Sequence, residues 1–286
     1  MAGLTTAKEI RAAISLCAVP GSERIGRSLA EFGEEHTLDL LMRGIGPKKV
    51  INDIRQATLR VQQVLDSPHY RFITPQDLEW PALLRDLDCD QPVGLWCRGQ
   101  GNLADLSVKQ IAIVGARAAT SYGERMASAI ASNCVQWAGS VISGGAFGID
   151  AAAHRGALSS DGATVAVLAS GVDVAYPSAH TGLFDRIVES GLVISEAPPG
   201  TKAAKHAFLI RNRLIAALSQ ATVVVEAALR SGSLSTANWA NALGRPVWGV
   251  PGPLTSASSA GVHAGIRDGT MCIVADENDV LDSILG

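Results

Sequence analysis

Seven short runs rich in β-branched residues recur along the chain after residue 106 and constrain its fold more than any other feature. The runs lie at residues 109–117, 140–146, 163–170, 191–197, 221–227, 245–252 and 271–277. Ala-rich segments with helical spacing separate several of them, at 122–138, 184–190 and 212–220. Continuous apolar strands that alternate with helices indicate a parallel sheet covered on both faces. We therefore predict a doubly wound, mostly parallel, extended Rossmann-like α/β domain over residues 106–286.

The N-terminal part of the chain has a helical pattern instead. Its apolar residues recur at helical spacing in four stretches, at 10–16, 25–32, 38–42 and 50–65. We predict a small helical domain over residues 1–65. The break RGIGPKKV, residues 43–50, places glycines on both sides of Ile45 ahead of a basic helix start. It fits either a helix-hairpin-helix module that holds a phosphate on backbone N–H groups or a plain turn between two helices.

Residues 66–105 join these two parts and are rich in Pro, Asp and aromatic residues. Their Trp and Leu content is too high for a mobile tether. We predict a linker that packs on the neighbouring domain. A chain of 286 residues is longer than the usual single domain, which suits one large domain with a small one appended.

The overall composition restricts the partners and the compartment. A net charge of −3 and a pI near 6.1 provide no global attraction to nucleic acid or to an anionic membrane, so such binding needs a local basic cluster. The five cysteines have no C-x-x-C spacing and suit reduced thiols in a cytosolic protein. The chain shows neither a signal pattern nor an apolar run near the roughly 20 residues of a spanning helix. We predict a soluble cytoplasmic protein without a membrane partner.

Ligands of a doubly wound sheet bind beyond the carboxyl ends of its strands, so the loops there are the candidate sites. The first loop reads VGARAATSYG and contains only Gly115 of the G-x-G-x-x-G fingerprint that a dinucleotide needs. The second strand ends in glycines rather than in the acid that binds a ribose. We therefore expect no NAD or FAD. The first loop instead offers Arg117 and several backbone donors to an anion.

The second loop, in VISGGAFGIDAAAHRGAL, reads as a strand that ends at glycines and passes directly into a helix. Gly144 and Gly145 allow a ligand to approach the backbone closely. Asp150 lies in the first helical turn and fits a cap better than an anion site. Asp150 and His154 are four residues apart on one helical face, but the sequence supplies no third ligand for a metal. We expect no metal site.

The fourth loop, APPGTKAAKHAFLIRNRLIAALS, concentrates positive charge in a chain that is acidic overall. Its basic residues are Lys202, Lys205, His206, Arg211 and Arg213. Asn212 adds an amide able to bind a base edge or a phosphate, and Phe208 provides a stacking surface. We predict a basic pocket that Arg117 completes. In the alternative interpretation the arginines pair with carboxylates elsewhere in the fold; the nearest acids in sequence are Glu196 upstream and Glu226 downstream.

The fifth and sixth loops carry weaker signals. Glu226 ends the fifth strand, and with Arg230 it fits a structural pair that shapes the turn better than a catalytic acid. The sixth loop contains the lone His263, which fits a surface residue.

Six segments occur together in an order and spacing similar to those of the DprA/Smf family of DNA-processing proteins. The segments are SGGAFGIDAAAH, VLASGVDVAYPSAH, SEAPPG, RNRLIAALS, VVVEAALRSGSLSTA and GRPVWGVPG. The resemblance covers residues 106–276. More faintly, WPALLRDLDCDQPVGLWCRGQ resembles the segment that precedes the family's sheet domain, and residues 1–65 resemble its small N-terminal helical domain. Many members also carry a C-terminal winged helix, which we do not expect in this chain.

The resemblance implies binding of single-stranded DNA without strong sequence preference, dimerisation through the Rossmann-like domain and help in loading the RecA recombinase. In naturally transformable bacteria this protects and delivers incoming DNA. Arg117, Lys205 and the RNR run of Arg211, Asn212 and Arg213 match the family's basic pocket, and Gly144 and Gly145 match its glycine pair. Ser178 stands where many members carry a DNA-contacting lysine, Ala116 replaces a common serine and Leu209 replaces a common proline; Lys202 can compensate for the missing charge.

A second hypothesis belongs to a different class. The chain could be a nucleotide or nucleoside-phosphate hydrolase similar to the phosphoribohydrolases, which have a related Rossmann-like sheet. Those enzymes use a P-G-G-x-G-T-x-x-E run whose Glu does acid–base work. The matching stretches here, VPGPLTSASS and RSGSLSTANWA, have no carboxylate at that place.

Overall fold

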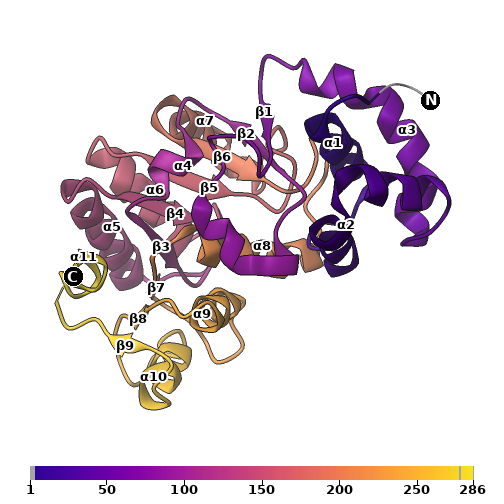
Figure 1. Ribbon diagram of the computed structural model, residues 1–286. Helices are drawn as coiled ribbons and strands as arrows, with labels where there is room; N and C mark the ends of the chain where they lie inside the picture. The colour runs from indigo at the N-terminus through magenta and orange to yellow at the C-terminus, as the bar shows by residue number, and fades with distance from the viewer. Residues whose placement is uncertain (1–3, 277, 286) are drawn as a thin grey trace.

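A mixed sheet runs through the centre of the protein in the computed structural model, which describes residues 4–276 and 278–285 (Figure 1). Within these residues the sheet has nine strands in the order β1-β2-β6-β5-β4-β3-β7-β8-β9. The strands are β1 (Arg71–Ile73), β2 (Leu95–Arg98), β3 (Gln110–Val114), β4 (Ser140–Ser143), β5 (Thr164–Val167), β6 (Leu192–Ser195), β7 (Ala221–Val224), β8 (Val247–Gly249) and β9 (Cys272–Ile273).

The seven strands from β3 to β9 are parallel to one another. Ile111 at the centre of the sheet pairs with Val141 of β4 on one side and with Ala221 of β7 on the other. Every apolar run of the sequence contains one of these strands, which confirms the predicted α/β sheet. Glu277, the last residue of the seventh run, lies outside the described residues.

Helices cover both faces of this sheet (Figure 1). They are α1 (Ala7–Cys17), α2 (Glu23–Met42), α3 (Lys48–Leu65), α4 (Leu103–Leu106), α5 (Ser121–Gln136), α6 (Ile149–Ser159), α7 (Thr181–Ser190), α8 (Lys205–Leu218), α9 (Ser233–Ala242), α10 (Ala260–Arg267) and α11 (Asp279–Leu285), with the 3₁₀ helices η1 (Ala82–Asp90) and η2 (Ser178–His180). No described helix is both long enough and apolar enough to cross a membrane.

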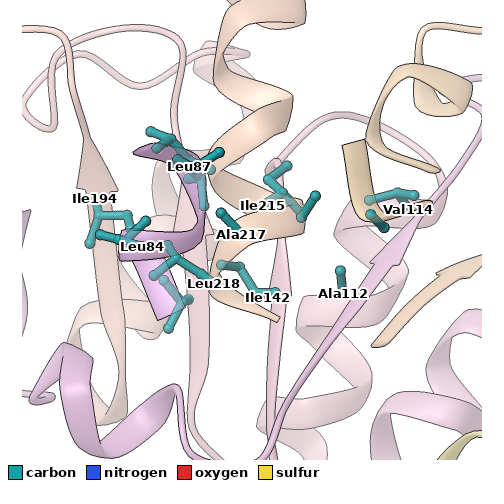
Figure 2. Close-up of a cluster of buried hydrophobic side chains, with 14 of the residues drawn as sticks. Leu84, Leu87, Ala112, Val114, Ile142, Ile194, Ile215, Ala217 and Leu218 are labelled. Atoms are coloured by element: carbon teal, nitrogen blue, oxygen red, sulfur yellow. The ribbon is translucent and has the colours of Figure 1, made fainter. Parts of the chain in front are cut away.

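Helix α8 is the buried centre of one face. Its Ile215, Ala217 and Leu218 lie between strand side chains and the leucines of η1, Leu84 and Leu87 (Figure 2). Because α8 has neighbours on both sides, its last five residues, 214–218, are apolar all round, as expected for a helix end enclosed in a core. Its N-terminal half is less buried and projects past the strand ends.

Helices α5, α6 and α7 pack on the opposite face of the sheet, and the N-terminal helices pack beside them on the same face. Trp96 of β2 lies in the same core cluster as Ile14 of α1 and Ile54 of α3. The Trp96 indole N–H donates to Ser15 Oγ over 3.0 Å. The N-terminal helices therefore share a core with the sheet.

The four apolar stretches at the N-terminus lie in α1, α2 and α3, with the second and third together in α2. Thr6 caps α1 with a capping box that includes Glu9. Gly33 interrupts α2 with φ of +76°, a backbone conformation that favours glycine. The break at residues 43–47 forms a turn in which Gly44 has φ of +83°, and α3 then begins at Lys48. Contact between this turn and DNA stays a prediction.

The segment 66–105 contributes Leu84 and Trp96 to the core and extends the sheet. β1 pairs with β2 and β2 with β6, both antiparallel. The sheet domain therefore begins at Arg71 and not at residue 106. These strands are only three and four residues long, too short for an apolar pattern to separate them from a packed loop.

The strand order reverses between β3 and β7. From β3 the chain adds β4, β5 and β6 in one direction, and it then returns to place β7 on the other side of β3. The loops after β3 and β7 therefore separate toward opposite faces and leave a crevice at the carboxyl edge. In open α/β sheets this switch point is where ligands bind.

Candidate functional site

A cavity of about 230 Å³ opens at this switch point. The loops after β3, β4 and β7 and the first turns of α8 and α9 surround it. Its lining includes Arg117, Ala146, Asp150, Phe208, Arg211, Asn212, Ser231, Ser233 and Thr236. The cavity therefore combines two arginines with one carboxyl group and several neutral hydrogen-bonding groups.

Arg117 and Phe208 form the mouth of the cavity. The Arg117 guanidinium lies over the Phe208 ring, with Cζ 4.8 Å from the ring centroid, a cation–π arrangement. Tyr176 lies on the same ring, with a centroid separation of 5.4 Å. A second cavity of about 160 Å³ adjoins this cluster and is lined partly by Phe147 and Gly144. The mouth thus presents an exposed cation together with aromatic rings.

Arg211 lies deeper and is buried against the second loop. Its guanidinium donates a hydrogen bond to the Val167 carbonyl. A Cβ on Gly144 would lie 2.6 Å from Nη2 and 2.7 Å from Cζ of Arg211. Position 144 therefore requires glycine, because the Arg211 guanidinium occupies the space that a side chain would fill. Burial lowers the pKa of Arg211 to about 10, and the nearby Asp150 carboxylate opposes that effect.

Asp150 is the buried acid of the cavity. It accepts a hydrogen bond from the backbone N–H of Ala146 over 3.2 Å, so it organises the turn before α6. The N-cap of that helix is Gly148 without a side-chain cap, so Asp150 does not cap α6 as predicted. Burial raises the pKa of the Asp150 carboxyl group, while the positive charge of Arg211 acts in the opposite direction. A carboxyl group at this depth disfavours a phosphate at the floor of the cavity and favours phosphate binding at the mouth.

His154 points into the core of the protein and takes no part in the cavity lining. Its Nδ1 lies 2.8 Å from Thr164 Oγ1, and burial lowers the pKa of His154 to about 3. The four-residue spacing allowed an acid–base or metal pair between Asp150 and His154, but the structure does not form it. The part of the chain that the structure describes contains no group of three or more His, Cys, Asp or Glu side chains arranged to hold a metal ion.

Gly145 has a different role from Gly144. Its φ of +69° is a left-handed conformation, and a Cβ there would lie 2.7 Å from Cε1 of Phe184. The Gly145 carbonyl accepts a hydrogen bond from His180 Nδ1 over 3.0 Å. The glycine pair is thus required by the protein's own packing, whether or not it also faces a ligand.

The RNR run divides between two surroundings. Arg211 and Asn212 line the cavity, and the Asn212 amide donates to the Gly232 carbonyl over 3.1 Å. Arg213 points away from the cavity and forms a buried ion pair with Glu196 over 2.7 Å, its side chain only 3% exposed. For Arg213 the structure thus matches the alternative interpretation, in which an arginine pairs with a distant carboxylate.

The two predicted lysines are exposed near the start of α8, Lys202 before the helix and Lys205 as its first residue. Neither lines the cavity at the switch point. Ser178 is exposed in η2, close in sequence to Tyr176. The cationic surface outside the cavity mouth therefore consists of side chains in solvent, free to follow a flexible ligand.

Glu226 is not paired with Arg230. Its carboxylate accepts from the Thr120 backbone N–H over 2.9 Å and from Thr120 Oγ1 over 2.5 Å. Thr120 is the N-cap of α5, so Glu226 ties the loop after β3 to the end of β7. Arg230 is exposed and, among the described residues, forms no ion pair with any carboxylate. Glu226 therefore has a structural role in shaping the turn, as predicted, but its partner is Thr120 and not Arg230.

Comparison with known proteins identifies the family. A family model described as DNA recombination-mediator protein A matches residues 71–285. The chain belongs to the DNA recombination-mediator protein A family. The match begins at β1, in agreement with a sheet domain that starts at Arg71.

Relatives of this family are similar across most of the chain. A relative from Mycobacterium tuberculosis is 47% identical over 224 residues, which are 75% of this chain and 57% of the relative. The DNA processing protein DprA of Streptococcus pneumoniae is 39% identical over 196 residues, 67% of each chain. The chain thus spans about three fifths of the length of the first of these relatives.

Solved structures of the family share the fold. The structure of DprA from Streptococcus pneumoniae superposes with a TM-score of 0.80 at 30% identity and covers 97% of both chains. A structure of DprA from Helicobacter pylori, described as giving insight into its single-stranded DNA binding mode, has a TM-score of 0.68 at 28% identity. It covers 76% of this chain and 97% of that one.

Several residues around this cavity were not predicted from the sequence. Tyr176 and Phe147 join Phe208 at the mouth, and Ser231, Ser233 and Thr236 line the cavity. A signal was available for the aromatic pair, because both follow strand ends that meet at the same edge of the sheet. The hydroxyl groups gave no signal, since serine and threonine are common in any loop.

Proposed function

We propose that this chain binds single-stranded DNA at the switch-point cavity with little sequence preference and acts as a recombination mediator. The observation that carries the proposal is the exposed Arg117 stacked on Phe208 at the mouth of a narrow polar cavity. A cation supplies phosphate contact and an aromatic ring supplies a surface for bases of any identity. This pairing suits a polynucleotide backbone with accessible bases.

The aromatic side chains at the cavity mouth favour a single strand over a duplex. Stacking on Phe208 and Tyr176 requires an unpaired base, and a base in a duplex is already stacked between its neighbours. The cationic groups of this surface are Arg117, Lys202 and Lys205 in solvent, with Arg211 beneath. Three to four neutralised phosphates correspond to a salt slope of about −2 to −3, which is roughly a twenty- to fiftyfold loss of affinity between 50 and 200 mM salt.

The biological setting in this proposal follows from the family. We infer a cytoplasmic homodimer that helps load the RecA recombinase on single strands, as in DNA uptake by natural transformation. We also infer that the protein binds without catalysing a reaction. The contacts of Glu226 support this, because its carboxylate is held by Thr120 and is not free for the acid–base role that the hydrolase alternative requires.

Fluorescence anisotropy with labelled oligo-dT and with mixed-sequence strands tests the binding proposal. We expect similar affinities for both strands and a weaker affinity for each in Arg117→Ala. Arg155→Ala removes an exposed arginine of α6 that does not line the cavity, and it should bind as the wild type does. A strong sequence preference, or equal losses in the two variants, would contradict the proposal.

The RecA proposal has a separate readout. The wild-type chain should increase the rate at which RecA hydrolyses ATP on oligo-dT, since more RecA is loaded on the strand. The Arg117→Ala variant should increase it less. No increase with a wild-type chain that binds the strand normally would refute the RecA proposal and leave the binding proposal intact.

A further inference from the structure

Helix α8 connects the DNA cavity to the N-terminal helices. Consecutive residues of an α-helix are about 100° apart around its axis, so residues two positions apart face nearly opposite sides. Arg211 lines the cavity, whereas Arg213 bonds to the segments that precede the parallel sheet. A displacement on the Arg213 side therefore moves the cavity side of the same rigid helix.

Glu196, which follows β6, bridges α8 to the loop between α1 and α2. One carboxylate oxygen accepts from the Gly21 backbone N–H over 3.1 Å, and the other accepts from Arg213 Nη2 over 2.7 Å. The side chains of Glu196 and Arg213 are 8% and 3% exposed. Because a buried charge without a partner is costly, the two side chains and the loop are held together strongly. Arg213 Nε also donates to the Asp90 carbonyl at the end of η1, over 2.9 Å.

The loop at residues 18–22 lies directly against α8. Gly21 has φ of +69°, and a Cβ on it would lie 2.5 Å from Cγ2 of Ile210. Pro20 of the same loop lines a small internal space together with Arg211. The loop thus packs against α8 at Ile210, one residue before Arg211, and shares a small cavity with Arg211. A side chain at position 21 would be strained by its backbone and would collide with the helix.

We propose that residues 18–22 and Glu196, here named the α8 clamp, hold α8 in the position that presents Phe208 and Arg211 to DNA. This inference rests on the proposed function. Glu196 and Gly21 are positioning residues, because they act through α8 and do not line the cavity. The N-terminal helices therefore contribute to the affinity for single strands without contacting them.

Two glycine variants provide a matched test. Gly21→Ala strains a left-handed residue and pushes the loop away from α8. Gly33→Ala strains a left-handed residue with a φ of +76° that has no atom within 4 Å of the added Cβ. Both variants should lower the melting temperature. Only Gly21→Ala should weaken oligo-dT binding at a temperature where both variants are fully folded, by roughly two- to thirtyfold, the range typical of residues that couple distant sites.

The salt dependence separates positioning from direct contact. Since the clamp touches no phosphate in this account, Gly21→Ala should retain the wild-type slope of affinity against salt concentration. Glu196→Gln should behave in the same way, because the Gly21 N–H and Arg213 bond to different carboxylate oxygens and the amide replaces one of these acceptors with an NH2 donor. A smaller slope in either variant would show that the clamp binds the strand directly and would overturn the proposal.

Hydrogen exchange tests the clamp independently of DNA binding. The amides at residues 205–212 should exchange faster in Gly21→Ala than in the wild type, and Gly33→Ala should leave them unchanged. Unchanged exchange in α8, or unchanged affinity with faster exchange, would overturn the clamp's role. If the wild type does not bind oligo-dT, the proposed function is wrong, and exchange in α8 still decides whether the clamp holds the helix.

Discussion

The substitution Gly144→Ala tests the position of the Arg211 guanidinium, which lies beside Gly144. Gly144→Ala adds a methyl group within 2.6–2.7 Å of the Arg211 guanidinium atoms Nη2 and Cζ, so the guanidinium must leave its place. Overpacking of this kind costs about 1–3 kcal/mol. Loss of the hydrogen bond from the guanidinium to the Val167 carbonyl costs about 1.5–3 kcal/mol. We expect the free energy of unfolding to fall by about 2.5–6 kcal/mol in urea denaturation, with weaker oligo-dT binding.

A second glycine provides the control for this experiment. Gly182 lies in α7 with no atom within 4 Å of an added Cβ, so Gly182→Ala should be neutral or stabilise by up to about 1 kcal/mol. Adding Arg211→Lys to Gly144→Ala removes the planar guanidinium and should recover part of the lost stability. If Gly144→Ala has the same urea midpoint as the wild type and binds DNA normally, the Arg211 guanidinium does not lie beside Gly144.

Three further predictions concern other parts of the molecule. The pKa of His154 is lowered from 6.5 to about 3, so this side chain takes up a proton less readily in the folded than in the unfolded protein. The free energy of unfolding should therefore be highest above pH 6.5 and fall by about 2 kcal/mol by pH 5. His154→Gln should flatten that pH dependence in urea titrations, whereas substitution of the exposed His69 should not. Phe208→Ala should weaken oligo-dT binding by about 1–3 kcal/mol with an unchanged salt slope, and Leu78→Ala, which removes an exposed leucine that does not line the cavity, should leave binding unaltered; a changed slope would show that the ring is not a stacking surface. Gly26→Ala places a methyl group against η1 and should lower the single melting transition of the whole protein; a separate early transition would show that the N-terminal helices unfold independently.

The parallel strands could be predicted because burial on both faces makes them continuously apolar. Ile111 and Ala112 are adjacent and face opposite sides of β3, yet neither is exposed to solvent. β1 and β2 lack this property. They are short antiparallel strands: β1 pairs with β2, and β2 pairs with β6, a partner about 100 residues away in sequence. Nothing in the local sequence records the pairing with β6.

The candidate site was predictable where the loops after parallel strands carry it. Arg117 comes from the loop after β3 and Phe208 from the start of α8, and the common edge of the sheet brings them together. Arg213 could not be separated from Arg211 by sequence, since both are basic and lie two residues apart. The rotation of α8 decides their roles, and that rotation depends on packing against Leu84 and Leu87 of η1 (Figure 2).

The central claim is that Arg117 and its aromatic neighbours form a site for single strands. Its most direct test compares single- and double-stranded oligonucleotides of the same sequence across a salt series, with the wild type and with Arg117→Ala. We expect the wild type to prefer the single strand and to lose affinity with a slope of about −2 to −3, and Arg117→Ala to reduce that slope by about 0.7. Equal affinity for the two forms, or an unchanged slope in Arg117→Ala, would contradict the account.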